Sequence, residues 1–227
     1  MVKLKYPLKV IGKEIQSFPR PEINPSLRFS IIPANEVKIN VKKITFINKG
    51  KKNMTSYSVL PIEIYVAKFG KPQIKTAKDN DLSNYLNNGL AEKEHMDGKA
   101  KTTIVFSKNK ILGYFTLRLT TIKTTIQINN ESKAYKGCEN LRSGSPVIEL
   151  LMYARDDNNK KLPMRIIFKK EILPQVKSVI KRVGTNDLYL ECDEKIVAVY
   201  EKLGFRAFGD FYVDDVRMLA MLRPIEI

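Results

Sequence analysis

Several kinds of residue and segment are scarce in this chain of 227 residues, and each shortage excludes a class of protein. Two cysteines, Cys138 and Cys192, are too few for a disulfide scaffold and show no metal-ligand spacing. No apolar run approaches the roughly 20 residues that span a bilayer. The first residues lack the uninterrupted hydrophobic region of a secretory signal. We therefore expect a cytoplasmic protein with free thiols, no metal site and no membrane segment.

Histidine is equally scarce, because His95 is the single one in the chain. An imidazole can act as a base near neutral pH. The surrounding residues, His95-Met96-Asp97-Gly98, are polar and typical of a turn. We therefore expect His95 to be a surface residue.

Acidic residues are few relative to basic ones: 24 Asp and Glu face 40 Lys and Arg, for a net charge of +16. The excess is uneven, since residues 1–70 carry 13 basic and 4 acidic side chains, whereas residues 188–227 carry 5 and 8. Such a field favours nucleic acid or another polyanion. The alternative is a lysine-rich surface that is only solvated. Composition leaves both interpretations open.

The first 72 residues are predicted to form a β-rich extension. Alternating apolar and β-branched residues predict strands at 38–47 and 57–67. A basic turn at 48–53 suits the tip of a hairpin between them. The second strand is expected to double as the first strand of the main sheet. A substrate-binding arm and a simple sheet extension are both compatible with this pattern.

Helices and strands alternate through the middle of the chain. Apolar residues three and four apart predict a helix at 79–94. Two strands joined by a polar turn are expected over 101–119, and the almost wholly apolar residues 147–154 predict a central strand buried on both faces. A helix is expected at 163–182, and Pro174 should kink or split it.

The stretch from Asn186 to Phe205 organises the rest of the chain. Its first seven residues alternate as a strand does, and Asp193-Glu194 suits the start of a helix. Gly204 follows the last apolar position of that helix, where a left-handed cap costs glycine nothing. Two closing strands are predicted at 205–211 and 216–222.

Three segments resemble the GNAT acetyltransferase superfamily. Val199-Tyr200-Glu201-Lys202-Leu203-Gly204-Phe205 resembles its closing signature, in which a tyrosine precedes Glu-x-Leu-Gly-Phe. The hairpin at 101–117 looks like the family's central hairpin, closest to the branch of bacterial toxins that acetylate aminoacyl-tRNA. Residues 146–156 are similar to the strand that enters the family's cofactor loop. Together the matches cover about residues 74–223, in the family's order.

The resemblance implies a fold and a function. The expected fold is α/β (α+β): a GNAT-like mixed central sheet flanked by helices, splayed where the fourth and fifth strands meet, over residues 73–227. The expected activity is transfer of an acetyl group from acetyl-CoA to an amine, either the amino group of an aminoacyl-tRNA or a protein lysine. Expected partners are acetyl-CoA, tRNA or other nucleic acid, a protein that is antitoxin-like or an acceptor, and a second copy in a homodimer.

Two residues match positions with catalytic roles in the family. Tyr200 would protonate the departing CoA thiolate as a general acid. Glu149 would act as general base for the attacking amine, directly or through water. The alternatives are a packing role for Tyr200 and a structural ion pair between Glu149 and a lysine.

The cofactor loop departs from the family's pattern, Gln/Arg-x-x-Gly-x-Gly/Ala. Lys161, Pro163 and Arg165 stand where the glycines of this pattern would be, and proline supplies no N–H. One hypothesis is that Lys160, Lys161 and Arg165 hold phosphate as side-chain cations. The other is that the loop has lost the cofactor, leaving a non-catalytic module that binds a protein or nucleic acid. The strand before the loop implies a further cofactor-binding set, which is Leu151, Met152 and Tyr153.

Overall fold

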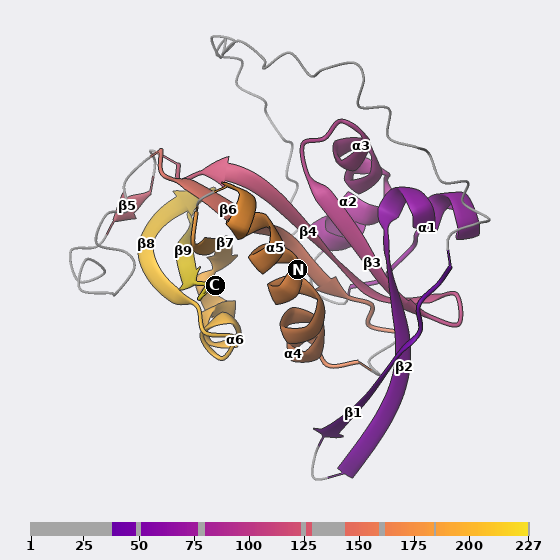
Figure 1. The fold of residues 1–227 in the computed structure, drawn as a ribbon. Coiled ribbons are helices and arrows are strands. Elements are labelled where there is room, and N and C mark those ends of the chain that lie inside the picture. The colour runs from indigo at the N-terminus through magenta and orange to yellow at the C-terminus, as the bar shows by residue number, and fades with distance from the viewer. Residues whose placement is uncertain are drawn as a thin grey trace, which may run out of the picture. The chain divides into compact units, whose positions relative to one another are not determined.

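The computed structural model describes residues 38–48, 51–76, 80–123, 126–128, 144–158, 162–183 and 185–226. Within these ranges, nine strands form one sheet that carries helices on both faces (Figure 1). The strands are β1 (Lys42–Asn48), β2 (Lys51–Pro61), β3 (Lys101–Ser107), β4 (Lys110–Thr121), β5 (Gln127–Ile128), β6 (Pro146–Arg155), β7 (Asp187–Asp193), β8 (Arg206–Val213) and β9 (Val216–Pro224). The helices are α1 (Ile62–Phe69), α2 (Asn80–Asn87), α3 (Leu90–Met96), α4 (Met164–Ile167), the π-helical η2 (Phe168–Ile172), α5 (Leu173–Val183), the 3₁₀-helical η3 (Glu194–Ile196) and α6 (Val197–Glu201).

The sheet is mixed, as the sequence predicts. Its described strands lie in the order β1-β2-β3-β4-β6-β7-β9-β8-β5. Neighbouring strands are antiparallel except for β6 and β7, which are parallel. A parallel pair needs a crossover connection, and the helical segment from α4 to α5 supplies it.

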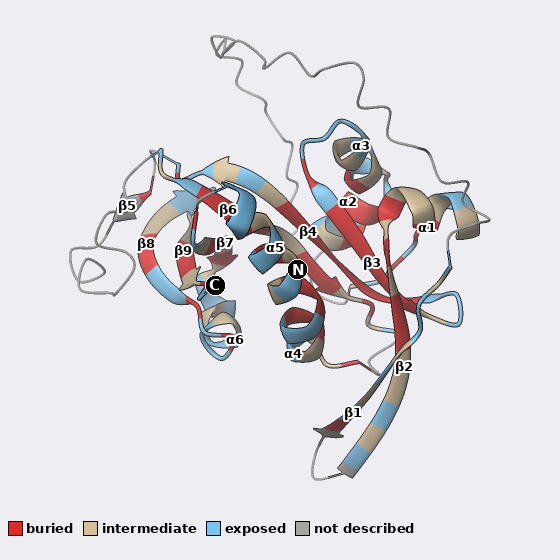
Figure 2. Ribbon diagram, in the orientation of Figure 1, coloured by how far each residue is buried: buried red, intermediate tan, exposed pale blue. Residues whose placement is uncertain are grey.

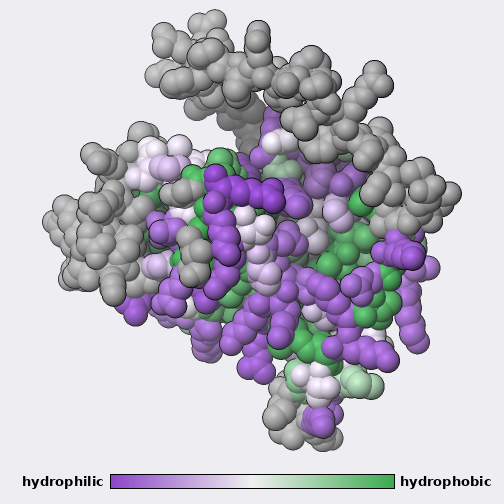
Figure 3. Space-filling view, viewed as in Figure 1, coloured by the Kyte–Doolittle hydropathy of each residue, from purple (hydrophilic) through white to green (hydrophobic). Residues whose placement is uncertain are grey.

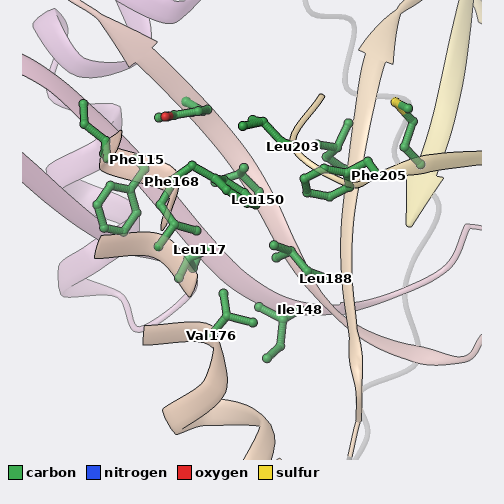
Figure 4. Packing of buried hydrophobic residues seen from close by; sticks show 14 of the residues in the cluster. Phe115, Leu117, Ile148, Leu150, Phe168, Val176, Leu188, Leu203 and Phe205 are labelled. Atoms are coloured by element: carbon green, nitrogen blue, oxygen red, sulfur yellow. The ribbon is translucent and has the colours of Figure 1, made fainter. Parts of the chain in front are cut away.

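One face of the sheet packs against α4, η2 and α5, and we call it the α5 face. Apolar residues of these helices meet alternate residues of the central strands, because successive side chains of a strand point to opposite faces. Figure 4 shows Phe168 and Val176 from the helical layer gathered with sheet residues such as Leu117, Ile148 and Leu188. Leu203 and Phe205, which follow α6, join the same cluster.

The opposite face, which we call the α1–α3 face, packs against the first three helices. Its core includes Ile62 and Tyr65 of α1, Leu86 of α2, Ile104 of β3 and Tyr114 of β4. Both faces of β3, β4 and β6 are therefore covered, and these strands are buried along most of their length (Figure 2). The near-continuous apolar run that predicts a central strand at 147–154 is confirmed by β6.

The predicted hairpins are confirmed, and their turns have a backbone conformation that matches their residues. Lys108 and Asn109 join β3 to β4, and Asp214 and Asp215 join β8 to β9, all with positive φ. A two-residue turn with positive φ at both positions fits the right-handed twist of the strands it joins.

Two predictions about helices and strands are wrong in detail. The helix expected at 79–94 is divided into α2 and α3, because Gly89 adopts a left-handed φ of 84° between them. The strand expected at 57–67 ends at Pro61, and α1 follows. Ile62, Tyr65 and Phe69 lie three and four residues apart, so these apolar residues form one face of a helix that packs on the sheet.

The predicted effect of Pro174 is confirmed. The helical segment changes from α to π over Phe168–Ile172 and returns to α at Leu173. Proline has no N–H to bond the carbonyl four residues earlier, so the ladder of an ordinary α-helix is interrupted near it. Glu171, which lies on the π-helical turn, is buried.

Three other expectations meet the structure only in part. No helix of the described residues is long and apolar enough to cross a membrane. Cys192 is a free, buried thiol whose pKa is raised to about 12 by burial, and Cys138 lies outside the described residues. The boundary proposed at residue 72 remains a prediction, although β2 already pairs with β3 through Ser58–Pro61.

Candidate active site

An opening in the sheet separates β6 from β7. The two strands pair at only two positions, Ile148 with Leu188 and Glu149 with Tyr189. On its other side, β6 pairs with β4 along its whole length, from Pro146 to Arg155. The splay predicted where the family's fourth and fifth strands meet, which are β6 and β7 in this sheet, is therefore confirmed. Among the described strands, none pairs with the β7 side of β6 beyond Glu149, which leaves peptide groups of residues 150–155 available to a ligand that adds to the strand edge.

A β-bulge lies in β6 beside this opening. Thr116 faces Met152 and Leu117 faces Leu150, so Leu151 is an extra residue without a partner on β4. Bulges are over-represented next to active sites because they redirect side chains. Here the bulge places Leu150 and Tyr153 in the core on the α5 face, whereas Leu151 and Met152 pack on the α1–α3 face. The apolar run of the sequence gives no sign of it.

Tyr200 stands at the α5 side of the opening. Asp193 ends β7 and accepts a hydrogen bond from the Lys195 amide at 2.8 Å, which caps the turn that leads into α6. Half-buried, the Tyr200 ring meets the Phe205 ring edge-on at 5.9 Å. The Tyr200 carbonyl accepts from the amides of Leu203 and Phe205. The predicted helix start, tyrosine and glycine stop thus form one compact turn.

Tyr153 lies on the same face as Tyr200. Its ring packs 6.5 Å from that of Phe168, and its hydroxyl donates to the Met164 carbonyl in the first turn of α4. Burial raises the pKa of Tyr153, and the neighbouring Tyr200 adds to the rise. This tyrosine therefore stays protonated and ties the end of β6 to the start of the helical segment.

Glu149 lies on the opposite, α1–α3 face and is 3% exposed. Its Oε2 accepts from Arg118 Nε at 2.5 Å, an in-register pair across β4 and β6. Burial raises the pKa of Glu149, Arg118 opposes the rise, and nearby Glu191 adds to it. The structural ion pair foreseen for this carboxylate is present, with an arginine in place of a lysine.

A polar cluster surrounds Glu149. Tyr189 donates to Glu191 Oε1 at 2.5 Å, and Lys123 donates to Glu191 Oε2 at 2.7 Å. Arg118, Tyr189 and Glu191 were not predicted as site residues. Alternation along β7 places Tyr189 and Glu191 on one face, but their approach to Glu149 depends on strand pairing that the sequence does not reveal.

The beginning of the loop after β6 is fixed by backbone contacts. The Asp156 carboxylate, which is buried, accepts from the Lys75 amide at 3.1 Å and the Asn158 amide at 3.4 Å. The Asp156 carboxylate is therefore engaged in hydrogen bonds within the fold. Lys160 and Lys161 lie outside the described residues, whereas Arg165 is exposed on α4. The structure therefore brings Tyr200 and Tyr153 together, and it places Glu149 across the sheet from them.

The prediction for His95 is wrong. This residue belongs to α3, and its side chain is 14% exposed. Its Nδ1 accepts from the Thr102 amide at 3.1 Å, and its Nε2 lies 2.7 Å from Glu63 Oε2. His95 thus joins α1, α3 and β3, which is a structural role.

Comparison with known proteins identifies the fold. No family model matches the chain, and no curated protein matches it. Among solved structures, a tyrosine-to-phenylalanine mutant of KacT matches with a TM-score of 0.55 and 15% identity, over 72% of this chain and 93% of that chain. AtaT complexed with acetyl-methionyl-tRNAfMet matches with a TM-score of 0.54 and 16% identity, over 72% and 93%. AtaTR bound with AcCoA gives 0.52 and 16%, over 73% and 93%.

The likeness to these proteins is a likeness of fold. It confirms the GNAT-like architecture that the three sequence segments predict.

Proposed function

We propose that the protein is an N-acetyltransferase that moves an acetyl group from acetyl-CoA to an amine. The observation that carries this proposal is the opening between β6 and β7, with Tyr200 on one face of the sheet and Glu149 on the other. A proton donor on one side and a proton acceptor on the other suit a transfer in which a thiolate departs and an ammonium must be deprotonated.

The opening fits the acyl donor in shape and bonding. The free edge of β6 offers an extended chain such as pantetheine those peptide groups of Leu151, Met152 and Tyr153 that point away from β4. We assign the phosphates to Lys160, Lys161 and Arg165, since a loop without glycines must attract them with side-chain cations. Buried Asp156 is already held by amides, which lessens the repulsion expected from the acidic start of the loop. Acetyl-CoA would supply the activated acetyl thioester.

Tyr200 is assigned the role of general acid. The edge-on contact with Phe205 and the short turn of α6 fix the direction of its ring. Tyr153, anchored to the Met164 carbonyl, holds the neighbouring backbone of β6 against α4. A fixed donor beside the opening is what protonation of a leaving thiolate requires.

Glu149 is assigned the role of general base, acting directly or through water. Burial raises its pKa towards the range in which a base works near neutral pH, although Arg118 opposes that rise. Because Glu149 lies on the α1–α3 face, the acceptor amine would approach the opening from that face. The side chains of Glu191 and Tyr189 lie beside it there.

The acceptor is proposed to be the amino group of an aminoacyl-tRNA or a protein lysine. AtaT, whose fold is similar, was solved with acetyl-methionyl-tRNAfMet, and the net charge of +16 suits an RNA acceptor. A cytoplasmic protein with an antitoxin-like partner would agree with these assignments.

Calorimetry with acetyl-CoA and a turnover assay test the proposal. Tyr200→Phe should lower kcat by about a hundredfold or more, within the range for general acid catalysis, and barely change the acetyl-CoA affinity. Tyr212→Phe, at an exposed position on β8, is the matched control and should change neither. Full activity in Tyr200→Phe would remove Tyr200 from the mechanism. Absence of acetyl-CoA binding at millimolar ligand would favour the non-catalytic binding module.

A further inference from the structure

The helical segment from Met164 to Val183 presents a surface of one charge sign. Its single carboxylate, Glu171, is buried. Hydrophilic side chains gather over α4 and α5 in Figure 3. All six cations of the segment are exposed: Arg165, Lys169, Lys170, Lys177, Lys181 and Arg182.

Glu171 does not neutralise this surface, because its carboxylate is engaged inside the fold. Its Oε2 accepts from Lys42 Nζ at 2.6 Å, and its Oε1 accepts from the Tyr57 hydroxyl at 2.7 Å. Both partners come from the β1–β2 hairpin. The contacts therefore dock that hairpin onto the π-helical turn η2, a kind of turn that is frequent at functional sites.

An open hollow lies where the hairpin meets η2. Its volume is about 340 Å³, and it is lined by Lys42, Lys43, Ile44, Tyr57, Lys170 and Glu171. Since Lys42 balances Glu171, the charges of Lys43 and Lys170 leave the hollow cationic. Positive charge thus continues from the helical segment onto β1.

Several cations elsewhere in the fold are paired with carboxylates. Lys123 lies 2.7 Å from Glu191, and Arg217 lies within 2.9 Å of both Glu194 and Asp210. On the helical segment, no carboxylate of the described residues forms an ion pair with any of five cations: Lys169, Lys170, Lys177, Lys181 and Arg182.

One spacing within this set is unfavourable for the helix, although Lys181 and Arg182 lie in its last turn, where cations are favourable. Lys177 and Lys181 are four residues apart, where like charges destabilise a helix. A set of cations without internal partners suits an external polyanion.

We propose that these residues form a docking surface for the phosphate backbone of an RNA. We call it the basic face and define it as Lys43, Lys169, Lys170, Lys177, Lys181 and Arg182. Repeated cations along a helix can meet repeated phosphates without reading sequence. Within the helical segment from Met164 to Val183, Val183 is the one exposed large apolar residue, so this part of the surface lacks the apolar anchors of a protein interface.

The inference does not rest on the proposed function, because the basic face lies on the α5 face of the sheet, whereas the acceptor amine is assigned an approach from the α1–α3 face. The surface itself can be tested without turnover. Fluorescence anisotropy of the full chain with a labelled, uncharged tRNA transcript should show affinity that falls steeply with salt, with a log–log slope of about 0.9 for each phosphate contacted.

The test variant is Lys170→Glu with Lys177→Glu and Lys181→Glu. It should lower RNA affinity at least about tenfold and reduce the salt slope by about three. The matched control changes the charge equally on exposed residues outside the basic face, namely Lys71→Glu with Lys93→Glu and Lys101→Glu. It should lose much less affinity. In case charge reversal impairs folding, a second test variant carries glutamine at the same three positions. It should also lose more RNA affinity than a control with glutamine at the three control positions.

Equal losses in the test and control variants would show a diffuse charge effect and overturn the docking surface. Unchanged RNA affinity together with lost binding of a polyglutamate peptide would overturn it in favour of an acidic protein partner. Acetyl-CoA titration separates this inference from the proposed function. If the parent protein binds RNA but not acetyl-CoA, the basic face is supported and the transferase proposal is overturned. If it binds acetyl-CoA but not RNA, only the basic face is overturned.

Discussion

The two sides of β6 differ sharply in how they are joined to the sheet. Towards β4, pairing runs from Pro146 to Arg155, whereas towards β7 it stops after Glu149. The closed side carries the Arg118–Glu149 ion pair, and the open side carries Tyr200 and the start of the loop. The difference shows that the central strand serves as a rigid wall on one side and as an exposed binding edge on the other.

The largest loss of stability should follow from breaking the Arg118–Glu149 ion pair on the β4 side of β6. Arg118→Met leaves Glu149 buried without its cation, and loss of one partner of a buried pair costs about 3–5 kcal/mol of unfolding free energy. Urea denaturation measures the loss. Arg118→Met combined with Glu149→Gln should recover much of it, since the uncompensated charge is gone. Equal stability of the single and double variants would contradict this account.

The same substitution should make stability depend on pH. Burial raises the pKa of Glu149 in the folded protein above its ordinary value of 4.5. A carboxyl group with a raised folded pKa favours folding below its unfolded pKa and loses that contribution as pH rises through the folded pKa. Removing Arg118 removes the influence that lowers this pKa. The destabilisation by Arg118→Met should therefore be larger at pH 8 than near pH 4, and the reverse order would exclude Glu149 as the cause.

On the β7 side of β6, substitutions in the cofactor loop should lower the affinity for acetyl-CoA. Lys160→Ala with Lys161→Ala should weaken acetyl-CoA binding by about a hundredfold, because a charge-assisted contact contributes about 1.5–3 kcal/mol. The variant should also lose the thermal stabilisation that acetyl-CoA gives the parent. Lys108→Ala with Lys110→Ala, in the β3–β4 turn, is the control. Stabilisation retained in full would place the phosphates elsewhere.

A smaller loss of stability is expected where the β1–β2 hairpin, on the β4 side of β6, contacts η2. Tyr57→Phe removes one of the two donors to buried Glu171 and should cost about 1–3 kcal/mol, as for a buried polar group left unsatisfied. Thermal unfolding measures it, with Tyr212→Phe as the exposed control. A loss no larger than the control's would mean that Lys42 alone suffices to hold the hairpin against η2.

Much of this fold can be predicted from the sequence because the patterns that determine it involve residues close together in the chain. The β3–β4 hairpin, the buried run of β6 and the helix stop at Gly204 each depend on residues within a few positions of one another. The same holds for the interruption of the helix near Pro174. Propensity, periodicity and turn chemistry decide such features.

The remaining features depend on contacts between distant residues. Arg118 is 31 residues from Glu149, and Lys42 is 129 residues from Glu171. The bulge at Leu151 depends on the register of β4, and the break at Gly89 was hidden in a stripe that continues across it. Glu149 could therefore be chosen from the sequence, but neither its partner nor its face could.

Amide hydrogen exchange with and without acetyl-CoA tests the central claim most directly, because it locates the ligand on one side of β6. The account predicts added protection at those amides of residues 151–155 that point away from β4, with no change in the β3–β4 turn. Binding that leaves these amides unchanged, or that protects a different edge of the sheet, would contradict the claim that the opening between β6 and β7 holds the acyl donor.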